Sequence, residues 1–179
     1  DLGVAGADKI IHHGMDFLWS RHRDTKYGGY FWGVDNCGAP EPVKQAYGHA
    51  FVLLAASAAK RAAHPDAERL LADITEVIQT KFWEPAVGAT TEDYSPDWCA
   101  LDAYRGQNSN MHLTEALMAA FQATGAAMYL EMAESIAQLI IQEHAQAADW
   151  RIPEHFDAHW QIDYNYGGNP MFRPAGTTP

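Results

Sequence analysis

The sequence predicts an all-α protein that is built of helix pairs. Two Ala-rich segments, 42–63 and 108–124, are apolar on nearly every side, which is the pattern of helices buried among other helices. Each is followed by an amphipathic segment, and the two units align when His49 is matched with His112. A long repeat made of helix hairpins indicates an α-solenoid or a closed α/α toroid. The contrast between buried and amphipathic helices favours the toroid, of which the chain would supply about half.

The first half of the chain contains three of the predicted helices. Apolar residues with mostly helical spacing predict a helix over 7–22, and the glycine-bounded aromatic segment 27–35 predicts a short strand or hairpin. The first buried helix, 42–63, follows. Pro65 with acidic neighbours then marks the first turn of an amphipathic helix, which we expect to run to about Phe82.

The second half of the chain follows the same order. A long loop, 83–107, is rich in Pro, Asp, Tyr and Thr and leads into the second buried helix. After Gly125 an amphipathic helix is expected over about 127–146, and residues 148–179 again have loop composition. Short β hairpins are expected within these loops.

Composition limits the kinds of partner that the chain can bind. Its 179 residues are 47% hydrophobic and fit a single domain, 1–179. The formal charge of −11 argues against a nucleic-acid partner, because phosphate binding needs clustered Lys and Arg. No apolar run approaches the roughly 18 residues of a membrane span, and no signal-peptide pattern opens the chain. Cys37 and Cys99 lack CxxC spacing and are interpreted as reduced thiols in a cytoplasmic protein.

Three polar residues at the start of the second buried helix form the leading candidate site. Asn108, His112 and Glu115 have the spacing i, i+4 and i+7, which places them on one face of the helix. Polar side chains on a buried helix are costly unless a polar partner meets them. That partner is either a ligand or a neighbouring helix, and a core histidine hydrogen-bonded within the protein is the alternative interpretation of His112.

Other candidate residues lie near the ends of the predicted loops. Tyr47 and His49 lie near the start of the first buried helix, at the repeat position equivalent to His112, so they are expected to face the same pocket. Arg173 lies between prolines on a stiff loop and suits a ligand oxygen, with an ion pair to an acid as the alternative. Tyr47 has the alternative of a packed aromatic ring with a hydrogen-bonded hydroxyl.

The sequence gives little support for a metal site, a cofactor site or a nucleophilic catalytic residue. His155 and His159 have i, i+4 spacing, but the loop context disfavours a helical metal pair and no third ligand has motif spacing. Neither a GxSxG, a P-loop nor a GxGxxG motif occurs. Glu92 and Asp93 are adjacent carboxylates in a loop. We therefore expect no metal and no cofactor.

Three segments occur in an order that is familiar from a known family. They are Arg-Gly-Gln-Asn-Ser-Asn-Met-His-Leu-Thr-Glu-Ala at 105–116, Gln-Ala-Tyr-Gly-His-Ala-Phe at 45–51, and Asp163-Tyr164-Asn165 followed by Phe172-Arg173-Pro174. Together they resemble the N-acylglucosamine 2-epimerase superfamily, and most closely its mannose isomerase and sulfoquinovose isomerase branch. The resemblance covers essentially the whole chain.

The resemblance implies an (α/α)6 barrel and a metal-free proton transfer between sugar carbons 1 and 2. In the family, paired histidines move the proton through a cis-enediol(ate), and surrounding polar residues hold the hydroxyls. By the match of motifs, Tyr47, Asn108, His112 and Arg173 correspond to substrate-contacting positions. His112 would contact the reacting end of the open-chain sugar in a supporting role.

One departure from the family pattern affects the expected activity. In the family, the Arg-Pro loop leads into a Gly-His-x-x-Glu helix with one catalytic histidine, and the second histidine lies near the C-terminus. Pro179 comes before both, so the chain is expected to be an incomplete segment that is inactive alone. The favoured function is an aldose–ketose isomerase of the mannose/fructose type that binds a monosaccharide or small oligosaccharide. An N-acylglucosamine or cellobiose 2-epimerase and a non-catalytic α/α sugar-binding protein remain as alternatives, and the oligomeric state is left open.

Overall fold

Five α-helices form the body of the protein in a computed structural model, which describes residues 4–167 and 177–178. The helices are α1 (Ala7–Phe17), α2 (Ala46–Arg61), α3 (Ala67–Val77), α4 (Gln107–Thr124) and α5 (Ala127–Ala137). Three of them continue into π-helical segments, at Leu18–His22, Ile78–Phe82 and Gln138–Ala145. Within the described part of the chain, no helix is long and apolar enough to cross a membrane.

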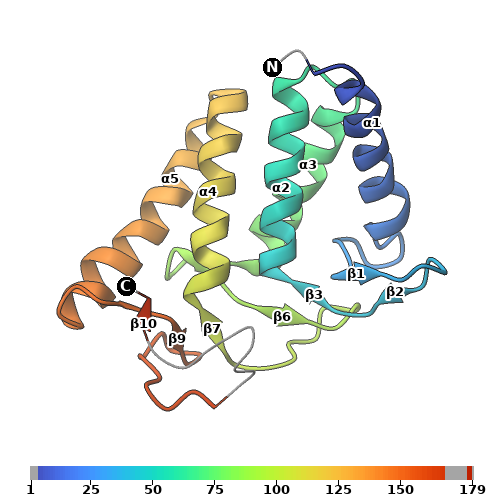
Figure 1. Cartoon of the computed structure of the whole chain (residues 1–179). Coiled ribbons are helices and arrows are strands. Elements are labelled where there is room, and N and C mark those ends of the chain that lie inside the picture. Colours follow the sequence, from blue (N-terminus) through green and yellow to red (C-terminus); the bar gives the residue numbers. More distant parts are fainter. Residues whose placement is uncertain (1–3, 168–176, 179) are drawn as a thin grey trace.

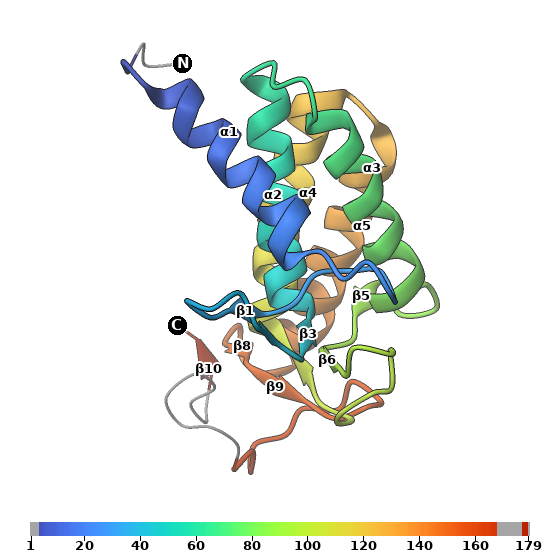
Figure 2. The same cartoon turned by 90° about the vertical axis from the view of Figure 1, so that its right-hand side faces the viewer.

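The helices form two layers (Figures 1 and 2). α2 and α4 pack against each other as an inner layer, while α3 covers α2 and α5 covers α4 from outside. Small buried residues, Ala56 on α2 and Ala116 and Ala120 on α4, allow the two inner helices to approach closely. The outer helices contribute larger buried side chains such as Leu70 and Ile136. This arrangement confirms the predicted pairs of inner and outer helices.

The short strands of the described residues gather at one end of the helices (Figures 1 and 2). They pair antiparallel as β1 (Gly33–Val34) with β2 (Pro40–Glu41), β3 (Lys44–Gln45) with β6 (Asp93–Tyr94), β4 (Trp83–Glu84) with β5 (Ala89–Thr90), β7 (Arg105–Gly106) with β9 (His155–Phe156), and β8 (Ile152–Pro153) with β10 (Thr177–Thr178). β3 leads directly into α2, and β7 leads directly into α4. Both inner helices therefore begin at the loop end.

The start of one predicted helix needs correction, and the predicted loops contain short strands. The helix predicted from residue 42 begins at Ala46, because Lys44 and Gln45 instead pair with Tyr94 and Asp93 in a short ladder. The segments 83–107 and 148–167, predicted as loops, contain β4–β7 and β8–β9. These strands confirm the expectation of short β elements within the loops.

The internal repeat has a different register from the predicted one. The two inner helices begin at Ala46 and Gln107, and these starts define which positions are equivalent. His49 is the fourth residue of α2, and Asn110 is the fourth residue of α4. The predicted alignment of His49 with His112 is therefore wrong by two positions.

Candidate functional site

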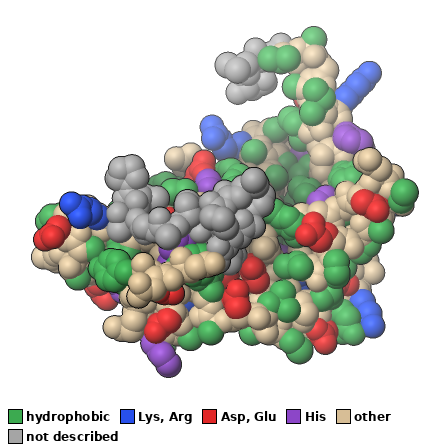
Figure 3. Space-filling view, turned by 60° about the horizontal axis from the view of Figure 1, so that its bottom comes forward, with side chains coloured by type: hydrophobic (Ala, Val, Ile, Leu, Met, Phe, Trp, Pro, Cys, Tyr) green, Lys and Arg blue, Asp and Glu red, His purple; other side chains and the backbone are tan. Residues whose placement is uncertain are grey.

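A cleft of about 710 Å³ opens at the loop end, beside the first turns of both inner helices. Figure 3 looks onto this end, where acidic and hydrophobic side chains lie side by side on the surface. The lining includes aromatic, acidic and uncharged polar residues: Trp32, Tyr47, Tyr104 and Tyr166, then Glu41, Glu92 and Asp93, then Gln45, Asn108 and Ser109. Such a surface combines apolar faces with convergent hydrogen-bonding groups, as small-molecule sites do.

Tyr47 and Asn108 occupy equivalent positions, each the second residue of its inner helix. Both line the cleft, so the prediction that they lie near one pocket is supported by their placement. The Tyr47 ring also contacts Trp32 and His112 edge-on, with ring centroids 5.8 Å and 5.0 Å away. These contacts fix the orientation of the phenol at the cleft wall.

His112 lies one turn further into α4 than Asn108. Its ring packs between Tyr47 and Phe51, whose ring centroid is 4.9 Å away. Nδ1 of His112 is 3.4 Å from Oε2 of the exposed Glu115. The imidazole is 24% exposed, and His112 is not among the residues that line the cleft, which it meets only through its contact with Tyr47. Arg173, the remaining predicted contact residue, lies outside the described residues.

His49 does not face the cleft, contrary to the prediction. It is buried, its Nδ1–H donates to the Gln45 carbonyl, and its Nε2 accepts the Tyr30 amide. Burial lowers the pKa of His49 to about 4, so the ring is neutral at pH 7. Asn110 makes the same pair of bonds, donating to the Gly106 carbonyl and accepting the Thr90 amide. Both side chains tie the start of an inner helix to the preceding loop.

Two equivalent ion pairs support the strands that lead into the inner helices. Lys44 is fully buried and donates to Asp24, with Trp98 lying 4.5 Å from its ammonium. Burial works to lower the pKa of Lys44, and it outweighs the opposing hydrogen bond from Asp24. Since side chains alternate along a strand, the buried Lys44 directs the next residue, Gln45, toward the cleft.

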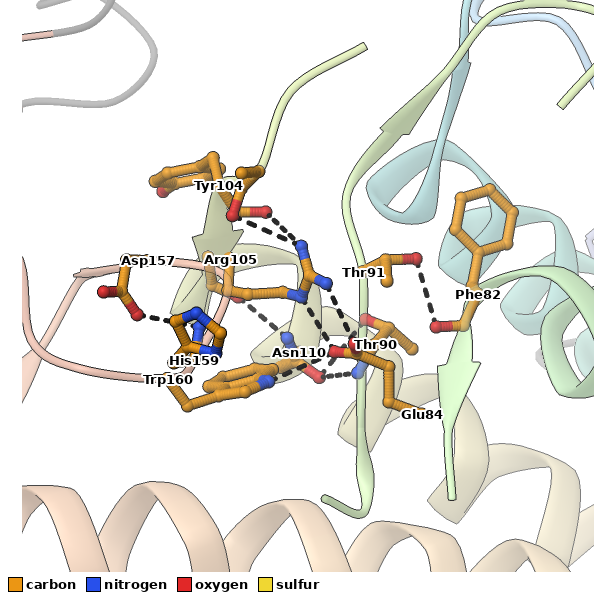
Figure 4. Close-up of polar contacts among 12 residues, drawn as sticks. Phe82, Glu84, Thr90, Thr91, Tyr104, Arg105, Asn110, Asp157, His159 and Trp160 are labelled. Carbon is orange, nitrogen blue, oxygen red and sulfur yellow. Dashed lines mark hydrogen bonds and ion pairs between the residues drawn. The ribbon is translucent and has the colours of Figure 1, made fainter. Parts of the chain in front are cut away.

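The second ion pair is drawn in Figure 4. Arg105 forms two hydrogen bonds with Glu84, of 2.8 Å and 2.9 Å, and the indole of Trp160 donates to the same carboxylate. Burial works to raise the pKa of Glu84, but the hydrogen bonds from Arg105 and Trp160 outweigh it and hold the pKa below its usual value. Gly106 follows Arg105 and lies at the cleft. An ion pair therefore also holds β7, the strand that leads into α4.

A buried polar cluster around Gly106 was missed by sequence reasoning. Ser109 donates to the Glu92 carboxylate at 2.7 Å, and the Tyr104 hydroxyl is 2.8 Å from Nδ1 of His155. All four polar side chains are buried or nearly so. The sequence offered Glu92 only as a loop carboxylate and His155 only as a weak metal ligand, because their partners are distant in the chain. The structure instead places His155 against Tyr104, while His159 is exposed.

Comparison with known proteins agrees with this arrangement. The model of the N-acylglucosamine 2-epimerase family matches residues 1–179. The chain belongs to this family. It is 43% identical to a D-mannose isomerase of Thermobifida fusca, over 98% of this chain and 44% of that protein. It is also 44% identical to a D-mannose isomerase of Pseudomonas cannabina pv. alisalensis, over 99% of this chain and 43% of that protein.

A solved structure shows which part of the family fold is present. A crystal structure of a D-mannose isomerase superimposes with a TM-score of 0.90 and 36% identity, covering 98% of this chain and 46% of that one. The chain thus spans less than half the length of the relatives that it matches. The chain supplies about half of an (α/α)6 barrel, as the family resemblance implies.

Proposed function

We propose that this chain forms part of the substrate wall of an aldose–ketose isomerase that acts on mannose-type sugars. The observation that carries the proposal is the meeting of Tyr47 and Asn108 at one cleft, with His112 against Tyr47. It is supported by the name D-mannose isomerase of relatives that are 43% and 44% identical. The runner-up function is sugar 2-epimerisation, which shares the family and the same kind of pocket.

The residues at the cleft suit the binding of an open-chain sugar. An Asn amide both donates and accepts, so Asn108 matches a sugar hydroxyl or the oxygen of an enediolate. The rings of Trp32 and Tyr47 offer apolar faces for C–H groups. We propose that His112, which contacts Tyr47 at the cleft wall, positions the reacting end of the sugar. The histidine pair that moves the proton is proposed to lie outside residues 1–179, so this segment alone is expected to be inactive.

A sugar panel with product identification tests the proposed reaction. The full-length protein that contains this chain is incubated with mannose, glucose, N-acetylglucosamine and cellobiose, and products are identified by NMR. Formation of fructose from mannose supports the isomerase. An epimer as the sole product would replace the proposal by the 2-epimerase alternative. Sugar binding without turnover of any sugar would support a non-catalytic binding protein.

Replacement of His112 by Ala tests its assignment to the pocket. We expect kcat/KM for mannose to fall by about 100-fold, or about 2.7 kcal/mol of transition-state stabilisation. The matched control is His13→Ala, because His13 is exposed on α1 and does not line the cleft. Both variants should melt close to the parent protein. Near-normal turnover by His112→Ala would remove His112 from the site.

A further inference from the structure

The cleft is bordered by two equivalent pairs of residues on facing strands. In the β3–β6 pair, Gln45 lies directly opposite Asp93. In the β7–β9 pair, Gly106 lies directly opposite His155. Gln45 comes immediately before α2 and Gly106 immediately before α4, so the two pairs are equivalent in the repeat of inner helices and loops. Two positions with the same backbone environment thus carry different chemistry.

The pair on β7 and β9 is closed by neighbouring side chains. A Cβ on Gly106 would lie only 2.6 Å from Oε1 of Glu92 and 2.9 Å from the Tyr104 hydroxyl, so these groups occupy the space of the missing side chain. His155 is buried, bonded to Tyr104, and stacked on Tyr166 with ring centroids 4.1 Å apart. Tyr104 and Tyr166 line the cleft. This side therefore presents aromatic rings to a ligand.

The pair on β3 and β6 presents polar groups instead. Gln45 and Asp93 are both half-buried and both line the cleft. Residues directly opposite each other on antiparallel strands project to the same side, with Cβ atoms about 5 Å apart. A carboxylate accepts hydrogen bonds and an amide both donates and accepts. Such a pair can hold two sugar hydroxyls, each of which also both donates and accepts.

The position of the pair relative to His112 indicates which end of the sugar it meets. Gln45 lies just before the first turn of α2, whereas His112 lies more than one turn inside α4. Tyr47 follows Gln45 by two residues and its ring contacts His112. If His112 meets carbons 1 and 2, the strand pair lies nearer the opposite end of the chain of carbons.

We propose that Gln45 and Asp93 form a specificity-determining pair that binds the sugar hydroxyls remote from the reacting carbons, at C4 and C6. This inference rests on the proposed function, since it assigns part of the same cleft to part of the substrate. The buried Lys44–Asp24 ion pair and the β3–β6 ladder hold the pair in place. The pair selects the sugar and takes no part in proton transfer.

The test combines substitutions by residues of similar size with substrates that lack one hydroxyl. Gln45→Leu and Asp93→Asn are prepared in the full-length protein and assayed with D-mannose, 4-deoxy-D-mannose and 6-deoxy-D-mannose. We expect KM for mannose to rise about tenfold with kcat nearly unchanged, since a uniformly formed hydrogen bond is lost. For the deoxy sugar that lacks the bound hydroxyl, the same substitution should change kcat/KM by less than about twofold.

Controls separate this outcome from a structural effect. Gln142→Leu repeats the change made at Gln45, and Glu131→Gln likewise replaces a carboxylate by an amide. Both sites are exposed, and both variants should keep parental kinetics. Equal losses on all three sugars, or a fall in kcat alone, would overturn the proposal. So would parental KM values in both cleft variants.

A binding measurement distinguishes failure of the pair from failure of the proposed function. If no aldose is converted, the isomerase proposal fails, and calorimetric titration with D-mannose and the two deoxy sugars then tests the pair alone. The proposal for the pair is supported if the variants bind mannose about tenfold more weakly and lose no affinity for one of the deoxy sugars. Unchanged affinity in both variants overturns it.

Discussion

His49 provides the most direct test of the repeat register, because its equivalent residue in the next unit is Asn110. Both side chains donate to the carbonyl one helical turn earlier and accept an amide from the preceding loop. We therefore expect His49→Asn to fold and to preserve at least the bond to the Gln45 carbonyl. The substitution removes the titratable ring, which the first unit has at this buried position and the second unit lacks.

The magnitude follows from the pKa of His49. Its ordinary value is near 6.5, and burial lowers it to about 4 in the folded protein. A lowered pKa means that the folded state resists protonation of His49. Stability from this site is therefore complete above pH 6.5 and declines as the pH falls from 6.5 to 4. At about 1.4 kcal/mol per pKa unit, the decline amounts to about 3 kcal/mol.

Urea denaturation of parent and variant between pH 7 and pH 4 measures this effect. At pH 7 we expect His49→Asn to be less stable by about 2 kcal/mol, since the shorter side chain leaves a small cavity and a weaker bond to Tyr30. That difference should shrink and then reverse as the pH falls toward 4. Burial also lowers the pKa of His144, but it titrates equally in both proteins and cancels in the difference. Parallel loss of stability in parent and variant would refute the assignment.

Two further substitutions test the Arg105–Glu84 ion pair and the turn between β4 and β5. Arg105→Met should destabilise the fold by about 3 kcal/mol at pH 7, because it leaves the half-buried Glu84 carboxylate without its cation. The pKa of Glu84 is lowered in the folded state, so this cost should fade in urea titrations as the pH drops below about 4. Gly88→Ala should cost about 3 kcal/mol in the same assay, since its φ is +81° and its Cβ would overlap the Ser135 hydroxyl. Gly125→Ala, at φ +73° with open space, is the matched control and should cost only about 1 kcal/mol. Equal costs at the two glycines, or no effect of pH on the Arg105 variant, would contradict these expectations.

The helices could be predicted from the sequence because their signals are local and long. Burial on one face recurs with the helical period in α3, where Leu70, Leu71 and Ile74 are all buried. The short strands could not be located in this way, because strands this short give no period to detect. Lys44 is in β3 only because Tyr94, far along the chain, lies opposite it. A ladder of that kind depends on tertiary contacts that no local pattern records.

The placement of a residue at the cleft could be predicted where the residue belongs to a recognisable motif. It could not be predicted where the only guide was alignment of the internal repeat. Tyr47 and Asn108 stand in recognisable segments, and the structure places both at the cleft. The sequence aligns His49 with His112 because the two residues are identical, although the structural equivalent of His49 is Asn110. Identity of residue type is a poor guide to register in a diverged repeat, since two different side chains can make the same two hydrogen bonds.

Equivalent positions in the two repeats fall into two groups: those that stabilise the strands before the inner helices, and those that line the cleft. Lys44 and Arg105 differ in type but share one task, an ion pair with an acidic residue from the preceding loop region, and neither lines the cleft. Gln45 and Gly106 follow them directly, share one backbone position, and both border the cleft. The two ion-paired positions keep a cation in both repeats, whereas the two positions at the cleft differ in chemistry. That contrast supports the proposal that Gln45 contacts the sugar, and it emerges only when the two repeats are compared.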